Sequence, residues 1–190
     1  MKPAASASTK FTYEDFVNFP DDGKRHEIID GEHFVTPSPN TKHQTIATNL
    51  TVALGGYLKH RPIGRVFAAP FDVVFSDLDV VEPDLLYISR ERAGVLTAQH
   101  VRGAPDLVVE ILSPGTRKVD EVTKRKLYER SDVREYWVVD PELDAIKVYR
   151  RAGGVFTRAA EVTAEAGDIL TTPLLPEFSV ALAEIFAEPA

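Results

Sequence analysis

Two carboxylates lie inside segments of the sequence that are otherwise apolar. Glu110 interrupts the run Leu107–Leu112, and Asp84 follows Pro83 within the segment Val80–Ile88. Two carboxylates on neighbouring strands would form an oxygen-only site of the kind that Mg²⁺ or Mn²⁺ prefers. Such an ion polarises a phosphoryl oxygen and generates hydroxide from bound water, and phosphodiester hydrolysis needs both.

A structural role is the alternative for each of these carboxylates. An unpaired carboxylate in an apolar strand is costly, so Glu110 must be ion-paired, protonated or bound to a metal, unless it lies at an exposed sheet edge. The dipeptide Pro83-Asp84 is also common in ordinary turns. The metal-site interpretation therefore depends on the combination of Asp84 with Glu110, 26 positions later.

A lysine beside the two carboxylates would orient water or stabilise developing negative charge. Lys124 and Lys126 are the candidates in the following predicted helix, and at ~100° per residue they point ~200° apart. Lys124 shares a face with Asp120, Leu127 and Tyr128. Because this face is partly apolar, we expect it to point inward and assign the functional role to Lys124.

Hydrophobic periodicity and turn residues predict how the chain positions these groups. Helices are predicted over residues 12–19, 41–60, 119–131 and 180–186, and a hairpin with an Asp30-Gly31 turn over residues 26–35. Strands are predicted over residues 65–69, 71–75, 80–89, 106–112, 135–140 and 145–150. This order of elements predicts a mixed α/β fold, an α+β arrangement with a mixed sheet.

The chain as a whole sets further limits. Its 190 residues suit one domain, and we expect a disordered leader over residues 1–10 and a single domain over 11–187. The absence of cysteine fits a reducing cytoplasm, and no apolar segment has the length of a membrane span. The formal charge is −7, so a nucleic acid would need a local basic patch; the best candidate is segment 117–130, which could also be a solvated face of mixed charge.

Five segments in order resemble the motifs of a bacterial family described as restriction endonucleases (the Uma type), a branch of the PD-(D/E)XK nuclease superfamily. They are Glu27–Gly31, Pro83-Asp84, Gly103–Pro114, Asp120-x3-Lys124-x3-Tyr128 and Val133–Asp140. The resemblance covers about residues 11–187. It implies a restriction-endonuclease-like core, a central mixed β-sheet flanked by helices, with Mg²⁺ or Mn²⁺ held by Asp84 and Glu110.

The sequence departs from the superfamily pattern at one position. Leu112 stands where the usual lysine would follow Glu110, and the resemblance implies that this lysine has migrated to Lys124. Glu27 resembles an extra acidic residue that assists metal binding or water positioning, although it could simply form a polar hairpin face. For His43 a capping or surface role is favoured over a site role.

Asp106 shares a strand face with Glu110 and could support the site, but Pro105-Asp106 is more plausible as a turn. We expect a magnesium-dependent endonuclease that hydrolyses DNA and forms a homodimer, because cutting both strands usually needs two sites. Two alternatives remain open. The chain could be a binding module that keeps the fold without catalysis, or a phosphoesterase acting on small nucleotides.

Overall fold

The computed structural model describes residues 9–188. Most of the predicted leader, residues 1–8, lies outside the described residues. The α-helices are α1 (Tyr13–Phe16), α2 (Thr41–His60), α3 (Arg125–Arg130) and α4 (Leu182–Phe186), with a 3₁₀-helix at Arg90–Val95 and a π-helix at Val119–Lys124. Among the described residues, no helix is long and apolar enough to cross a bilayer.

Thirteen strands form three sheets in the described part of the chain. The strands are β1 (Arg25–Ile29), β2 (Glu32–Thr36), β3 (Gly64–Ala68), β4 (Val73–Ser76), β5 (Asp79–Val81), β6 (Leu85–Ser89), β7 (Val101–Arg102), β8 (Leu107–Ile111), β9 (Glu135–Asp140), β10 (Ala145–Ala152), β11 (Val155–Thr163), β12 (Ile169–Thr171) and β13 (Ser179–Ala181). The sheet orders are β11-β10-β9-β8-β6-β3, β2-β1-β5-β4-β7 and β12-β13.

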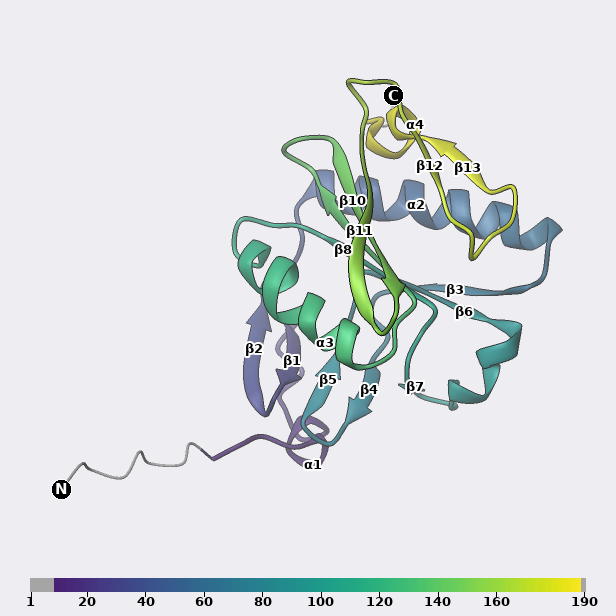
Figure 1. Cartoon of the computed structure of the whole chain (residues 1–190). Coiled ribbons are helices and arrows are strands. Elements are labelled where there is room, and N and C mark those ends of the chain that lie inside the picture. The colour runs from purple at the N-terminus through teal and green to yellow at the C-terminus, as the bar shows by residue number, and fades with distance from the viewer. Residues whose placement is uncertain (1–8, 189–190) are drawn as a thin grey trace.

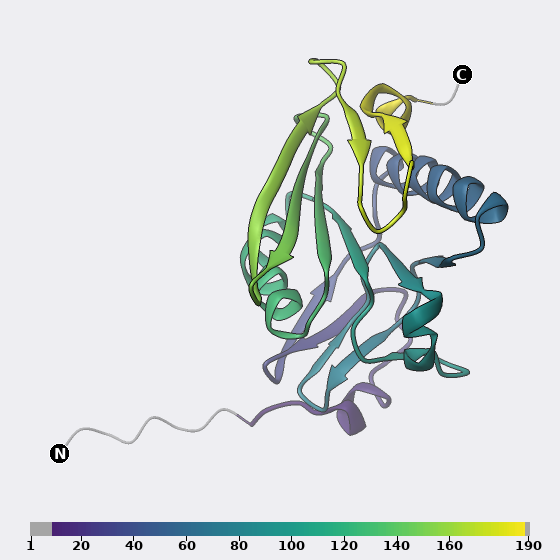
Figure 2. The ribbon, with the colours of Figure 1, turned by 45° about the vertical axis from the view of Figure 1, so that its right-hand side comes forward.

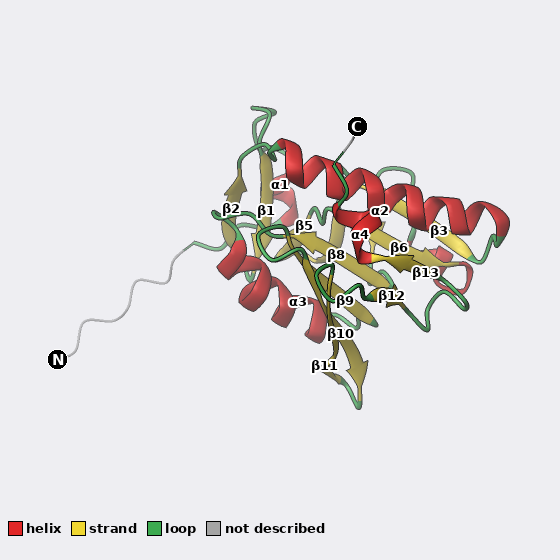
Figure 3. Ribbon diagram, turned by 90° about the horizontal axis from the view of Figure 1, so that it is seen from above, coloured by secondary structure: helices red, strands yellow, loops and turns green. Residues whose placement is uncertain are grey.

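Strand β8 lies inside the six-stranded sheet and makes it a mixed sheet (Figure 1). It pairs with β9 in parallel and with β6 in antiparallel orientation. Helix α2 lies on one side of the sheet and α3 on the other (Figure 3). The predicted α/β class with a helix-flanked mixed sheet is therefore confirmed.

The two faces of β8 enter different apolar cores, because successive strand side chains point to opposite faces. Leu107, Val109 and Ile111 pack in the core that contains the α2 residues. Val108 packs instead in the core that contains Leu127 of α3. Glu110 lies two residues after Val108 and shares its face of the strand, so its carboxylate points toward the layer formed by the π-helix and α3.

The long helix and the hairpin form where the sequence predicts them. Helix α2 spans Thr41–His60 and buries Ile46, Leu50, Leu54 and Leu58 along one face. The β1–β2 hairpin turns at Asp30 and Gly31, whose φ angles are 52° and 76°. Two successive positive φ angles are the requirement of a type I′ turn, and the Asp-Gly pair tolerates them.

The predicted strand over residues 80–89 is wrong, because the structure divides it between two sheets. Strand β5 pairs with β1 and β4 in the five-stranded sheet, whereas β6 pairs with β3 and β8 in the six-stranded sheet. The connection contains Pro83, which lacks a backbone N–H and cannot donate to a continuous ladder. The chain thus changes sheets in the connection that contains Asp84. In the turned view of Figure 2 the purple strands of the five-stranded sheet lie apart from the light green strands of the six-stranded sheet.

Further elements differ from the predictions. The helix predicted over residues 119–131 begins with a π-helical turn before it continues as α3. The prediction also omits the short strand β7 and the strands β11, β12 and β13. Strand β11 lies at the edge of the sheet, and most of its side chains are exposed. Its sequence therefore lacks the regular alternation of apolar and polar residues that indicates a half-buried strand.

Candidate active site

Four side chains singled out in the sequence come together at the end of β8 that faces the π-helix. Glu27 lies on β1, Asp84 in the β5–β6 connection, Glu110 on β8 and Lys124 at the end of the π-helix. All four are buried, with 1–4 % of their surface exposed. The tertiary fold therefore brings together acidic groups from three separate segments and one lysine.

Asp84 is fixed mainly through one of its two oxygens. Its Oδ2 accepts a hydrogen bond of 2.8 Å from the backbone amide of Ile111 and lies 3.2 Å from Nε2 of His43. Its Oδ1 is 2.9 Å from Nη1 of Arg25. These favourable contacts outweigh the effect of burial and lower the pKa of Asp84 to about 2. Asp84 is accordingly an ionised carboxylate at neutral pH.

Glu110 is also anchored through a single oxygen. The Tyr128 hydroxyl donates to its Oε1 at 2.5 Å, and Nζ of Lys124 lies 3.1 Å from the same atom. Neither contact uses Oε2. Burial raises the pKa of Glu110 well above its usual range against the attraction of Lys124, and the neighbouring carboxylates raise it further.

Lys124 is held among three carboxylates. Its Nζ lies 2.8 Å from Oε1 of Glu27, 3.1 Å from Oε1 of Glu110 and 3.6 Å from Oδ1 of Asp120. Burial alone would lower its pKa, but these carboxylates outweigh that cost and raise it. Lys124 is therefore an ammonium in this site. By contrast, Lys126 is exposed, which agrees with the helical geometry that separates the two lysines.

Glu27 is placed to orient Lys124. Its Oε1 accepts a hydrogen bond of 2.9 Å from the backbone amide of Glu82 in addition to the contact with Lys124. Asp120 is also buried, and burial raises its pKa. These groups leave the site with more carboxylates than cations, an arrangement that favours uptake of a proton or another cation.

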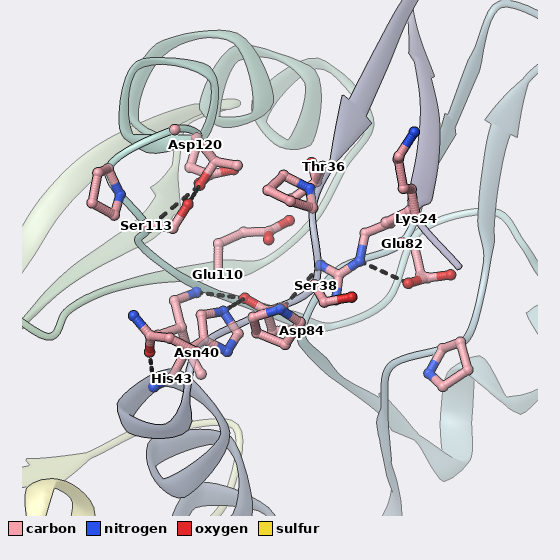
Figure 4. A pocket seen from close by; sticks show the side chains of 18 of the residues that line it. Lys24, Thr36, Ser38, Asn40, His43, Glu82, Asp84, Glu110, Ser113 and Asp120 are labelled. Carbon is pink, nitrogen blue, oxygen red and sulfur yellow. Dashed lines mark hydrogen bonds and ion pairs between the residues drawn. The ribbon is translucent and has the colours of Figure 1, made fainter. Parts of the chain in front are cut away.

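A pocket of about 590 Å³ opens onto these groups. Figure 4 shows Asp84, Glu110 and Asp120 directed toward the same space, with His43 beside Asp84. The lining includes Arg25 and Lys124 but not Glu27, which lies behind the lysine. A substrate in the pocket would therefore meet Asp84, Glu110 and the lysine.

The donor set suits a hard divalent cation in its chemistry, since the groups facing the pocket offer carboxylate oxygens. Among residues 9–188, however, no three His, Cys, Asp or Glu side chains have a geometry that could hold a metal. The two contacts that anchor Glu110 fall on Oε1, and Arg25 covers Oδ1 of Asp84. Asp84 and Glu110 could hold the ion if Arg25 released Oδ1, with Oε2 as the second oxygen.

The expectation for His43 is wrong. It is neither a surface residue nor the helix cap, because Asn40 caps α2 by accepting from the His43 backbone amide. The His43 ring is buried against Asp84, and its Nδ1 lacks a hydrogen-bond partner among the described residues. Its place three residues before Ile46 on the buried stripe of the helix was the available sequence signal.

The sequence reasoning also missed Arg25 and the role of the Tyr128 hydroxyl. Arg25 precedes Glu27 by two residues on the same strand and therefore shares its face. It links Glu82 and Asp84 by contacts of 2.7 and 2.9 Å. Tyr128 is one helical turn beyond Lys124 and reaches the same oxygen of Glu110. Strand and helix periodicity could have indicated both.

Asp106 does not join the site. It is fully buried, accepts a hydrogen bond of 2.7 Å from the amide of Ser89 and lies 2.9 Å from Nη1 of Arg134. The candidate basic patch over residues 117–130 is partly neutralised within the chain. Arg117 pairs with Asp140, and Arg130 pairs with Asp30 and Asp79.

The arrangement of a mixed sheet, flanking helices and acidic residues beside a lysine defines a restriction-endonuclease-like protein. The profile of the Uma2 family, described as “Putative restriction endonuclease”, matches residues 13–183, and the chain belongs to this family. No curated protein matches the chain.

Solved structures that are similar to the chain include the following two. One is a “putative nuclease belonging to DUF820” from Anabaena variabilis ATCC 29413, with 21% identity, a TM-score of 0.78 and coverage of 93% of this chain and 97% of that one. At this identity the likeness shows the fold. The other is the type IIG restriction endonuclease BpuSI, with 12% identity, a TM-score of 0.41 and coverage of 76% of this chain and 15% of that one.

Proposed function

We propose that this protein is a magnesium-dependent endonuclease that hydrolyses DNA phosphodiester bonds. One observation supports the proposal above the others: an excess of carboxylates gathered around two permanent cations at a pocket. The carboxylates are Glu27, Glu82, Asp84, Glu110 and Asp120, and the cations are Arg25 and Lys124. A divalent cation would relieve this excess, and membership of a family described as restriction endonucleases supports a nuclease site here.

Asp84 and Glu110 are the proposed metal ligands, and Mn²⁺ would suit the same oxygens. The bound ion would supply polarisation of a phosphoryl oxygen and a water of lowered pKa. Lys124 would stabilise the negative charge that develops on the phosphoryl group, since its Nζ lies at the carboxylate cluster and lines the pocket. Glu27 would keep that ammonium in place from the side away from the pocket.

The substrate assignment rests on the family and on the pocket. DNA is proposed because the family is described by restriction endonuclease activity. A homodimer is proposed with it, because two strands need two sites and twofold assemblies are the commonest oligomers. Residues 11–187 are proposed to act as one domain, since one apolar core joins residues of α2 and β8 to residues of α4.

A cleavage time course tests the proposal. Supercoiled plasmid is incubated with Mg²⁺ or Mn²⁺ and the wild-type protein, or with the Glu110→Gln variant. We expect nicked and linear products from the wild type and none from the variant. Melting with and without the ion provides a second readout, because a ligand that binds only the native state raises the midpoint. The metal should raise the midpoint of the wild type and should not raise that of Glu110→Gln.

A binding module without catalysis is the main rival, and it is favoured by the Arg25 contact that covers Oδ1 of Asp84. Metal binding without cleavage of any DNA substrate would support it. A phosphoesterase acting on small nucleotides would fit the pocket volume of about 590 Å³. Binding of DNA through several phosphates should weaken steeply as the salt concentration rises, whereas binding of a mononucleotide should have a shallow salt dependence.

A further inference from the structure

We propose that Arg25 is an exchangeable counter-ion, which neutralises Asp84 when no metal is bound and binds a substrate phosphate once a metal takes its place. The inference rests on the proposed function. It assigns a substrate-binding role to a residue that would otherwise be taken for half of a structural ion pair.

The division of contacts on Asp84 shows why the exchange is feasible. The backbone amide of Ile111 and the ring of His43 both hold Oδ2, whereas Arg25 contacts Oδ1. Release of Arg25 would therefore leave the carboxylate anchored in the same orientation. Glu110 is held in the same way, because its two anchoring contacts share Oε1. Each proposed ligand is thus fixed by one oxygen and can offer the other.

The contacts of Arg25 itself allow it to stay near the site after leaving Asp84. Its Nε lies 2.7 Å from Oε1 of Glu82, and its Nη1 lies 2.9 Å from Oδ1 of Asp84. Neither contact uses Nη2. Glu82 would tether the guanidinium while Nη1 and Nη2 become the pair of parallel donors that matches a phosphate.

The position of Arg25 is suited to a polymeric substrate. It lines the pocket that contains Glu110 and also a second groove of about 390 Å³ that follows helix α2. Pro39, His43 and Asp84 line both, so the two hollows meet beside Arg25. A phosphodiester strand could pass from one to the other, with one phosphate at the carboxylates and the next beside the guanidinium.

The second groove is itself compatible with a polyanion. Helix α2 contains no acidic residue in its 20 positions, although the chain has a net charge of −7. Its residues Gln44 and Thr48 line the groove and offer uncharged hydrogen-bond donors. A DNA strand bound along this helix would meet no carboxylate from α2. The acidic residues that line the groove are Glu82 and Asp84.

Arg25→Met tests the exchange because it removes the charge while keeping a flexible apolar stem. The matched control is Arg92→Met. Arg92 is 20 % exposed, against 17 % for Arg25, and bridges two carboxylates, Asp106 and Asp132, but lines neither hollow. Both variants lose a guanidinium from a comparable ion-pair network.

The first readout is the affinity for Mn²⁺ without DNA, measured by titration calorimetry. Arg25 competes with the ion for Oδ1 and repels it, so Arg25→Met should bind Mn²⁺ at least ~10-fold more tightly than the wild type. Arg92→Met should bind as the wild type does. Unchanged or weaker Mn²⁺ binding by Arg25→Met overturns the proposal, because a purely structural arginine would support the site and its loss would weaken binding.

The second readout is binding of a fluorescein-labelled DNA duplex, followed by anisotropy in Ca²⁺ at several salt concentrations. Arg25→Met should bind more weakly and lower the slope of log K against log salt by about 1, the value expected for one lost phosphate contact. Arg92→Met should leave that slope unchanged. If the slope of log K against log salt for Arg25→Met equals that of the wild type, Arg25 makes no phosphate contact and the proposal is rejected.

Arg25→Lys provides the test if Arg25→Met does not fold. Lysine keeps the charge but lacks the fork that contacts two carboxylates, so Mn²⁺ should still bind more tightly, by a smaller factor. If Arg25→Lys binds Mn²⁺ no more tightly than the wild type does, the proposal is overturned. Failure of the proposed function is distinct from this, because the wild type would then bind no Mn²⁺ and cut no DNA. If the wild type binds and cuts while Arg25→Met shows no gain, only the role of Arg25 is lost.

Discussion

The backbone amide of Ile111 donates a hydrogen bond of 2.8 Å to Oδ2 of Asp84. This bond joins the connection that follows Pro83 to strand β8, one residue beyond Glu110. Since the donor is a backbone group of a central strand, the position of Asp84 is tied to the sheet itself. The carboxylate of Asp84 is therefore held at a fixed place relative to the backbone of β8.

The first prediction concerns the stability of Glu110→Gln. The pKa of Glu110 is raised in the folded protein, so the carboxyl contributes most to stability below its unfolded value of 4.5, and this contribution is lost as pH rises through the folded pKa. Glutamine does not titrate. In EDTA the variant should be as stable as the wild type or more stable, with an advantage that grows from pH 5 to pH 8.

Urea denaturation at each pH measures this difference. A large loss of stability in the metal-free variant would contradict the prediction and identify Glu110 as a structural ion-pair partner of Lys124. Thr157→Ala provides a control for handling and baseline, because Thr157 is exposed on β11 and lies outside the pocket.

The second prediction separates Lys124 from Lys126. Lys124 is buried among carboxylates, whereas Lys126 is exposed two residues later. Loss of a single donor to developing charge typically lowers turnover by ~100- to 1,000-fold, and we expect this for Lys124→Ala in a plasmid cleavage assay with Mn²⁺. Lys126→Ala should cut at nearly the wild-type rate. Equal rates for wild type and a correctly folded Lys124→Ala would exclude a catalytic role for Lys124.

The third prediction concerns the hydroxyl of Tyr128. It donates to Oε1 of Glu110 and so should orient the carboxylate for metal binding. Loss of such a supporting hydrogen bond typically reduces metal affinity by ~10- to 100-fold, and we expect Tyr128→Phe to bind Mn²⁺ more weakly by this factor. Calorimetric titration with Mn²⁺ measures it.

Tyr136→Phe is a matched control for that experiment. Tyr136 is equally buried, its ring lies 5.0 Å from that of Tyr128, and its hydroxyl donates to the backbone carbonyl of Asp120. Both variants lose a buried hydrogen bond, which costs ~1–3 kcal/mol when the partner is left unsatisfied. If both lose Mn²⁺ affinity equally, Tyr128 acts only through stability and does not orient Glu110.

The fourth prediction concerns the segment between β8 and the π-helix, which lines the pocket. Arg117 of this segment contacts Asp140 through both terminal nitrogens, at 2.7 and 3.1 Å. Burial opposes the ionised form of Asp140, but the bonds from Arg117 and from the Glu142 amide outweigh it and lower the pKa. The stability that this carboxylate contributes is present above its unfolded value of 3.8 and is lost as pH falls through the folded pKa.

Asp140→Asn should therefore be less stable than the wild type at pH 7, and the difference should shrink as the pH is lowered below 3.8. Thermal melting between pH 2 and pH 7 measures it. A difference that stays constant with pH would mean that the ion pair does not account for the effect.

The sequence by itself determined several of the local elements and part of the composition of the site. The four-residue spacing from Ile46 to Leu58 required a buried helix face, and Asp30-Gly31 permitted the positive φ angles of a tight turn. Glu110 stood out because its neighbours are apolar. The face shared by Lys124 and Tyr128 followed from helical periodicity. All these signals lie within one segment, where the geometry of a helix or strand relates sequence spacing to direction.

Only the tertiary structure decided how these segments meet. The change of sheet at Pro83 depends on pairing of β5 with β1 and of β6 with β8, and no local period encodes such partners. The same holds for the contact of His43 with Asp84 and for Arg25, which joins Asp84 across 59 positions of sequence. Which oxygen of each carboxylate is held, and which remains for a ligand, is set by these long-range contacts, because it depends on the direction from which each donor approaches.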